Sequence, residues 1–222
     1  MIEYIKSQKE TNDAILNNKF NADELERFSK SDFRWVKNKG RSYQTRTIKK
    51  GEIYQFEFGK NYMPEMSYEH RGLVIGVKNK LLYILPIYSY DAKKHTDVYH
   101  PVDFPYSKGD LYLLKSSEFS WINHDSVLKL NDIRTVSINR ILYQHTGAKI
   151  DPATDTYKRI ETFVLQKYFA EFYHDFEQKS KTIELLNQDN AKLKEKIAAL
   201  EKEKCQLQTA IDSAKEPQDS VL

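Results

Sequence analysis

Residues 51–89, with the sequence GEIYQFEFGKNYMPEMSYEHRGLVIGVKNKLLYILPIYS, decide how this chain folds. Apolar side chains alternate loosely with polar ones at 53–58, and after a loop two further apolar runs follow at 73–77 and 81–87. Period-2 alternation and short apolar runs bounded by turn-forming residues predict three β-strands. Because the connections between them are short, we expect a meander that curls into a barrel or sandwich.

The loop between the first two predicted strands carries four ionisable side chains, Glu65, Glu69, His70 and Arg71. Functional groups concentrate in loops that a rigid sheet holds in place. For His70 and Arg71 two interpretations stay open. Either they belong to a functional site, or they are a loop histidine and an arginine that forms a salt bridge, for example with Glu69.

Composition narrows the class of protein. The chain has 222 residues, a net charge of +3 and one cysteine, Cys205. This length suits one domain with appendages, and the charge alone does not indicate a nucleic-acid partner. A single cysteine excludes an internal disulfide framework and a cysteine-based zinc site, and it fits a cytoplasmic location. No apolar run reaches the length of about 18 residues that a membrane span needs, so we expect a soluble protein with no membrane partner.

Residues 1–48 are predicted to form a helical arm and a basic linker. Asn21, with Glu24 three residues later, is typical of a helix N-terminus. At positions 34–50 every charged side chain is basic, and aromatic rings such as Trp35 are interleaved. Two interpretations stay open: a surface for single-stranded nucleic acid, which needs cations for phosphates and flat rings for bases, or a solvated linker.

The region after the meander is less regular. Lys93 and Lys94 belong to a polar loop that is suited to flank a groove. His95 and His100 are not spaced like metal ligands, so we expect both histidines at the surface. Three further strands are predicted, at 110–114, 126–130 and 132–136.

Arg134 lies among apolar neighbours in the last of these predicted strands. A charge in such surroundings is costly unless it is paired. Arg134 is therefore either a structural arginine bonded to a carboxylate, which is the commoner case, or a substrate contact.

The C-terminal part shows two helical patterns. Apolar residues from Ile160 to Phe176 recur at helical spacing, and we expect them to lay an aromatic face on the barrel. From Ile183 to Ile211 the spacing becomes a heptad repeat, with leucine at d and mainly isoleucine at a. Polar Asn190 at a, together with opposite charges at g and e positions, favours a parallel homodimer through this 183–211 zipper.

Four segments, three within the meander and one after it, match the conserved motifs of one protein family. They are GEIY at 51–54, NYMPE at 61–65, LPIYS at 85–89, and the blocks DS and IRTV followed by Arg140 within 125–140. In these motifs the segment 49–175 resembles the MazF/PemK toxins, which are ribosome-independent mRNA endonucleases of bacterial toxin–antitoxin modules.

The resemblance implies a mainly β fold, a small SH3-like barrel with flanking helices, followed here by a long C-terminal coiled-coil helix. It divides the chain into the arm and linker at 1–48, the barrel with its terminal helix at 49–175, the zipper at 176–213 and a disordered tail at 214–222. The N-terminal arm and the zipper lie outside the resemblance.

The same resemblance implies cleavage of single-stranded RNA without metal or cofactor, and an antitoxin protein as partner. The family's catalytic arginine falls at His70, next to Arg71, and its threonine falls at Tyr88, next to Ser89. For cleavage by the 2′-hydroxyl, His70 is suited to act as base or acid and Arg71 as the cation that binds the phosphate. Tyr88 or Ser89 is suited to donate a proton to the phosphate or to the leaving oxygen. The predicted RNA contacts are Glu65, Lys93, Lys94, Arg134, Arg41 and Trp35.

Three functions follow as expectations. The first is a sequence-specific endoribonuclease that acts as a toxin or phage-defence effector. The second is a catalytically degenerate module that keeps the fold, binds RNA or a protein, and oligomerises through its coiled coil. The third is a scaffold whose zipper recruits another coiled coil.

Overall fold

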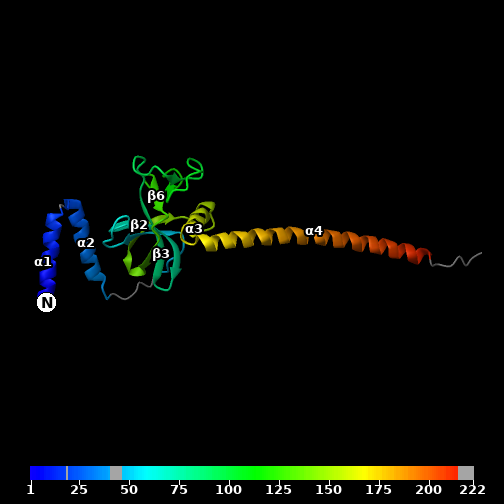
Figure 1. Cartoon of the computed structure of the whole chain (residues 1–222), viewed down its shortest axis with the longest axis horizontal. Coiled ribbons are helices and arrows are strands. Elements are labelled where there is room, and N and C mark those ends of the chain that lie inside the picture. Colours follow the sequence, from blue (N-terminus) through cyan, green and yellow to red (C-terminus); the bar gives the residue numbers. More distant parts are fainter. Residues whose placement is uncertain (19, 41–46, 215–222) are drawn as a thin grey trace, which may run out of the picture. The chain divides into compact units, whose positions relative to one another are not determined.

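The structure is a computed structural model of the chain, and it describes residues 1–18, 20–40 and 47–214. These residues form two compact units, one comprising Met1–Lys167 and one that begins at Tyr168 (Figure 1). The described chain is mixed α and β, with an eight-stranded sheet and four α-helices. The predicted tail at 214–222 lies, except for its first residue, outside the described residues.

The predicted meander is confirmed, but its second strand begins at Glu69 rather than near Leu73, so His70 and Arg71 lie on a strand and not in the predicted loop. Its strands are β1 (Glu52–Glu57), β2 (Glu69–Lys78) and β3 (Leu81–Ser89), and each pairs antiparallel with the next. Side chains of successive residues alternate between the two faces of a sheet. Both faces of this meander are apolar, which explains why parts of β2 and β3 are continuous apolar runs rather than simple alternations.

The remaining strands attach to the edges of this meander. β3 pairs with β7 along its first half and with β6 at its end, and β6 continues through β5 to β4, which pairs parallel to β5. The predicted strands at 110–114 and 126–130 are confirmed, whereas the one at 132–136 begins two residues later than expected. The bounds are β4 (Val98–Tyr99), β5 (Leu111–Leu114), β6 (Ser126–Lys129), β7 (Arg134–Ser137) and β8 (Ile141–Lys149).

A short connection between β7 and β8 shows that the meander is strongly curled. β7 pairs with β3 and β8 pairs with β1, yet only the 3₁₀ turn η1 (Ile138–Arg140) joins them. In a flat sheet β7 and β8 would lie four strand spacings apart, about 19 Å. The chain from Ser137 to Ile141 reaches about 14 Å at most. The sheet therefore bends until its edges approach, but no ladder between described strands closes it.

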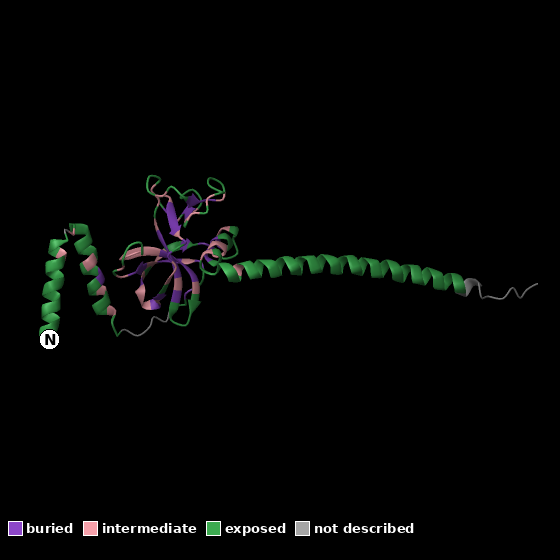
Figure 2. Ribbon diagram, in the orientation of Figure 1, coloured by how far each residue is buried: buried purple, intermediate pink, exposed green. Residues whose placement is uncertain are grey.

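The sheet buries two large apolar cores and a smaller cluster of Val98, Leu113 and Val127, and Figure 2 shows the buried residues concentrated in its strands. Neighbouring residues of β3 show the division, because Leu85 belongs to one core and Ile84 to the other. The first core also contains Tyr157, Ile160 and Val164 of α3 (Asp155–Tyr168), which covers that face of the sheet. The second core is enclosed by the bend and holds Tyr54, Phe56, Phe58, Val74, Leu82, Ile84, Val136, Ile138 and Ile141, with Ile48.

The N-terminal arm consists of α1 (Ile2–Asn17) and α2 (Ala22–Asn38). The predicted cap is confirmed, since Asn21 and Glu24 exchange both hydrogen bonds of a capping box. Helix α2 continues to Asn38, so the first part of the predicted basic linker is helical. Polar contacts connect α2 to the sheet: the Ser31 hydroxyl donates to the Glu57 carboxylate over 3.0 Å, within a largely buried cluster.

The aromatic face predicted for the C-terminal helix is confirmed in its first half, which belongs to the sheet unit. Ile160 and Val164 of α3 are buried, but Phe169, Phe172 and Phe176 are 55%, 68% and 60% exposed. The helix breaks at Phe169, and a second helix, α4 (Ala170–Ala214), begins. Phe176 lies seven residues before the a-position Ile183, so these rings continue the zipper seam rather than the core of the sheet unit.

The seam of α4 is unpartnered in the described chain. The apolar a and d residues from 183 to 211 are 49% to 59% exposed. Among the described residues no helix is both long enough and apolar enough to span a membrane.

Candidate active site

A groove of about 300 Å³ gathers the polar side chains at the end of the meander. It is named the Arg71 groove below. All four predicted catalytic positions contribute to its wall, together with residues from β1, β6 and β8 and from the segment before β6. The lining is Gln55, Glu69, His70, Arg71, Ile87, Tyr88, Ser89, His124, Ser126, Tyr143 and His145.

Strand register explains how distant residues meet here. Gln55 of β1 pairs with Tyr143 of β8 on one side and with Arg71 of β2 on the other, and Arg71 pairs in turn with Ile87 of β3. Residues directly opposite on adjacent strands lie side by side on one face of a sheet. The register therefore lines up Tyr143, Gln55, Arg71 and Ile87 across four strands.

Gly72 fixes the backbone next to Arg71. A Cβ atom added at Gly72 would lie 2.9 Å from Cδ2 of Phe56, whose ring is fully buried in the second core. Only glycine leaves room for the Phe56 ring to pack this closely over β2. The packing under Gly72 thus holds the strand that carries Arg71.

Ser89 and His124 form a hydrogen-bonded pair at the mouth of the groove. The Ser89 hydroxyl lies 2.8 Å from Nε2 of His124. Ser89 lies at the end of β3, where it pairs with Ser126 of β6, and His124 lies two residues before Ser126. The pair is exposed, so it is accessible to a substrate.

His145 faces the other side of the groove. Its Nε2 lies 3.0 Å from Oε1 of Gln55, and its ring centroid lies 5.1 Å from that of Tyr143. Burial lowers the pKa of His145, and the Arg71 guanidinium lowers it further. A neutral imidazole is therefore favoured at neutral pH, and a neutral imidazole is able to accept a proton.

The predicted catalytic residues divide between two faces of the sheet. Strand alternation places Arg71 and Ser89 on the face of Leu73 and Ile87, and it places His70 and Tyr88 on the opposite face. His70 is paired across the strands with the core residue Phe56.

The surroundings of His70 and Tyr88 agree with that division. Burial lowers the pKa of His70, and Arg27 of α2 adds to the effect. Tyr88 packs against a third apolar cluster, and its ring lies 5.1 Å from that of His95; burial raises the pKa of its phenol. Arg71 and Ser89 are thus the two predicted residues that lie on the same face of the sheet in the wall of the groove.

Two of the predicted RNA contacts, Arg134 and Glu65, form an ion pair with each other. The Arg134 Nε donates to Asp132 over 2.5 Å, and its Nη1 lies 3.3 Å from Glu65. Asp132 also accepts a hydrogen bond from the backbone N–H of Met66, so this cluster ties the loop before β2 to the sheet. The geometry favours the structural interpretation of Arg134.

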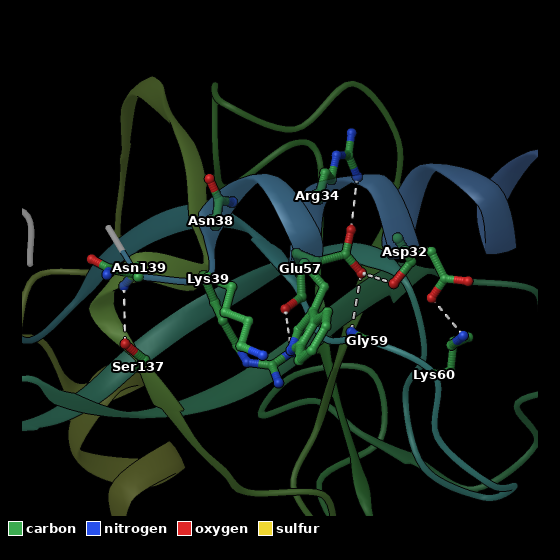
Figure 3. Close-up of a pocket in the computed structure, with 13 residues that line it drawn as sticks. Asp32, Arg34, Asn38, Lys39, Glu57, Gly59, Lys60, Ser137 and Asn139 are labelled. Carbon is green, nitrogen blue, oxygen red and sulfur yellow. Dashed lines mark hydrogen bonds and ion pairs between the residues drawn. The ribbon is translucent and has the colours of Figure 1, made fainter. Parts of the chain in front are cut away.

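Lys93 and Lys94 are exposed and do not line the Arg71 groove. Lys94 lies 3.7 Å from Asp91. Trp35 lines a second cavity of about 750 Å³ next to α2, where the Lys39 ammonium lies 5.1 Å from the centroid of its ring. Figure 3 shows this cavity, with Arg34 of α2 directed at Glu57 of β1. Arg41 lies outside the described residues, so its role stays a prediction.

His100 corrects another expectation. It is 1% exposed rather than on the surface, and its Nε2 lies 3.1 Å from Glu118 while Nδ1 accepts from the backbone N–H of Asp103. These contacts organise the loop after β4, which explains the burial. In the part of the chain that the structure describes, no three His, Cys, Asp or Glu side chains gather as a metal-binding group.

Sequence reasoning missed two of the three histidines that line the groove, His124 and His145. His124 directly precedes the DS block on which the resemblance rests, so its position was a usable signal. His145 lies on β8, a strand that the pattern did not predict, and only sheet pairing brings it to Gln55. A scan against models of known protein families finds no match, and a search of curated proteins finds no significant relative.

Proposed function

We propose that this chain is a metal-independent endoribonuclease that cleaves single-stranded RNA, a MazF/PemK-like toxin of a toxin–antitoxin or phage-defence system. The observation that carries the proposal is the Arg71 groove, whose wall contains the Arg71 guanidinium, the imidazoles of His124 and His145, and the Ser89 hydroxyl. These are the groups that transfer of a phosphodiester to an internal hydroxyl requires.

The reaction assigns each group a role. His145, favoured in its neutral form, removes the proton from the 2′-hydroxyl, whose oxygen attacks the adjacent phosphorus. The bond from phosphorus to the 5′-oxygen breaks, and His124, held by Ser89, gives that oxygen a proton. Arg71 binds the extra negative charge on the phosphorane oxygens. The products are a 2′,3′-cyclic phosphate and a 5′-hydroxyl end, so atoms and charges balance without an added reagent.

The proposal therefore assigns general acid–base catalysis to His145 and His124 instead of His70 and Tyr88. Both residues contribute to the wall of the groove, but strand alternation turns them to the opposite face from Arg71. His70 remains the alternative base, and the variants described below separate it from His145.

An SH3-like barrel is the fold that we propose for the strands β1, β2, β3, β7 and β8. The short β7–β8 connection and the enclosed second core support it. The proposed assembly is a cytoplasmic parallel homodimer through the α4 seam, with an antitoxin protein as the inhibitor that covers the groove.

The test is incubation of the purified chain with a long single-stranded RNA in EDTA, followed by mapping of the cut ends. We expect discrete cuts with cyclic phosphate ends. These cuts should be lost in Arg71→Ala, His145→Ala and His124→Ala, and they should persist in His95→Ala, a matched histidine outside the groove. Loss in His70→Ala with normal cutting by His145→Ala would instead identify His70 as the base.

Intact RNA that the wild-type chain nevertheless binds would overturn the nuclease and favour the degenerate binding module. Absence of both cleavage and RNA binding would leave the scaffold function. Cutting that requires an added divalent cation would contradict the proposed chemistry.

A further inference from the structure

A second groove, of about 340 Å³, lies between α2 and the sheet and continues the Arg71 groove. The two grooves share three lining residues, Gln55, Glu69 and His70, so they adjoin one another, and together they are named the channel. The remaining lining of this second part, named the α2 groove, comes from the helix and from its junction with β2: Arg27, Lys30, Arg34, Glu57 and Tyr68.

Helical spacing fixes which side of α2 faces this channel. Arg27, Lys30 and Arg34 follow each other at i, i+3 and i+7, so they lie on one face of the helix. Arg34 anchors that face, because its guanidinium lies 2.9 Å from Glu57 and 2.6 Å from Glu69. The anchor therefore directs Arg27 and Lys30 towards the α2 groove.

The three cations on this face of α2 differ in how free they are to bind an anion. Arg34 is neutralised by its two carboxylates, Glu57 and Glu69. Arg27 is exposed and forms no ion pair with any residue that the structure describes. Lys30 pairs with Glu26 one turn away, but both side chains are about 60% exposed, and such surface pairs contribute little. Two cations thus remain available for a polyanion.

Tyr68 supplies a flat ring in the same groove. Its backbone φ of 62° lies in the left-handed region, which a tyrosine rarely adopts. Two backbone hydrogen bonds hold it there, from the N–H of Phe58 to its carbonyl over 2.8 Å and from its own N–H to the carbonyl of Gly59. A fixed aromatic ring beside cations is the combination that binds unpaired bases and their phosphates.

We propose that α2 is part of the substrate site: Arg27 and Lys30 bind phosphates of the RNA strand that runs out of the Arg71 groove, and Tyr68 stacks on one of its bases. The inference rests on the proposed RNA substrate, and it adds a function for the N-terminal arm. Arg34 is the positioning residue of this arrangement, since its own charge is used by Glu57 and Glu69.

The test measures binding separately from cleavage. A fluorescent single-stranded RNA with 2′-O-methyl groups cannot be cut through its 2′-oxygens, so its affinity reports binding alone. The double variant Arg27→Gln/Lys30→Gln is compared with Lys37→Gln, which removes one charge from the same helix outside both grooves. Circular dichroism checks that each variant keeps its helix content.

Loss of two phosphate contacts has a defined signature. The slope of log affinity against log salt should become shallower by about 1.4, and affinity at about 0.1 M salt should fall roughly 25-fold. Lys37→Gln should leave the slope within about 0.7 of the wild-type value. Tyr68→Ala should weaken binding roughly 5- to 100-fold without a change of slope.

The outcomes also separate this inference from the nuclease proposal. A wild-type chain that binds RNA through Arg27 and Lys30 but leaves unmodified RNA intact would overturn the nuclease and keep the α2 site. Normal cleavage with unchanged affinity and slope in Arg27→Gln/Lys30→Gln would overturn the α2 site and keep the nuclease. Absence of any binding to single-stranded RNA by the wild-type chain would overturn both.

Discussion

The sheet unit and α4 are both rich in apolar residues, but the sheet unit buries these residues whereas α4 exposes them. In the sheet unit, adjacent residues such as Ile84 and Leu85 enter two different cores and are fully buried. In α4, Leu193 and Leu200 repeat every seven residues and are 57% and 54% exposed. A curled sheet brings distant segments of one chain against both of its faces, whereas a single helix cannot fold back on its own seam.

This difference implies that the two units differ in whether they need a second chain to bury their apolar side chains. The sheet unit contains its own cores, so its stability and its candidate chemistry should not require a second chain. The α4 seam buries its apolar side chains only when another helix covers it. The predictions below change one unit at a time, beginning with the largest effect.

Charges in the seam should abolish self-association. For Leu193→Glu/Leu200→Glu we expect a monomer, because a dimer would lose four buried leucines worth about 2 kcal/mol each, or about 8 kcal/mol. Leu185→Glu, at an outer c position with 62% exposure, is the matched control and should keep the dimer. Light scattering measures the mass; an unchanged mass in the double variant would contradict the zipper.

Removal of the groove cation should damage chemistry without damaging assembly. We expect Arg71→Ala to lower kcat/KM for RNA by about 10²–10³, or about 3–4 kcal/mol, since it removes the charge that stabilises the phosphorane. Lys78→Ala, at the other end of β2, should retain full activity. Single-turnover cleavage measures the effect, with light scattering as the check on mass. Wild-type turnover by Arg71→Ala would refute its role.

The two cores of the sheet unit should be equally intolerant of truncation. Ile84→Ala and Leu85→Ala each leave a cavity beneath a fully buried position, so each should lower the free energy of unfolding by about 2–5 kcal/mol. Leu186→Ala in α4 should change the unfolding of the sheet unit by less than about 0.5 kcal/mol. Urea unfolding followed by tryptophan fluorescence distinguishes them. A tolerant Ile84 would mean that the second core is loosely packed.

His145 and His70 should both titrate below the ordinary pKa of a histidine. Burial and Arg71 lower the pKa of His145 from its ordinary 6.5, and burial also lowers that of His70. As the imidazolium cannot accept a proton, kcat/KM should fall with decreasing pH only below 6.5. NMR titration of the two rings gives their pKa values independently of activity. A His145 value above 6.5 would argue against its assignment as the base.

Much of the candidate site could be anticipated, and the rest depended on pairing between strands. Arg71 and Ser89 were identified from loop chemistry and from their place in motifs. Adjacent residues of a strand always face opposite sides, so Arg71 and Ser89 separate from His70 and Tyr88 in any register. Which side of the sheet carries Arg71 and Ser89 depends on a register that the sequence pattern did not settle, because a shift by one residue exchanges the two faces. His145 was missed since β8 carries polar residues along much of its length and resembles no half-buried strand.

The sequence by itself determined the elements whose signals are local: the meander, the Asn21 cap and the heptad seam of α4. Each of these elements is predicted from the spacing of residue types along the chain. Three features arise only from contacts between distant segments: the bend of the sheet around a second core, the anchoring of α2 by Arg34, and the presence of His124, His145 and Arg71 in one groove wall. Those contacts join residues up to 90 positions apart. Their geometry is set by strand register and by sheet curvature, and neither of these is encoded in any single stretch of sequence.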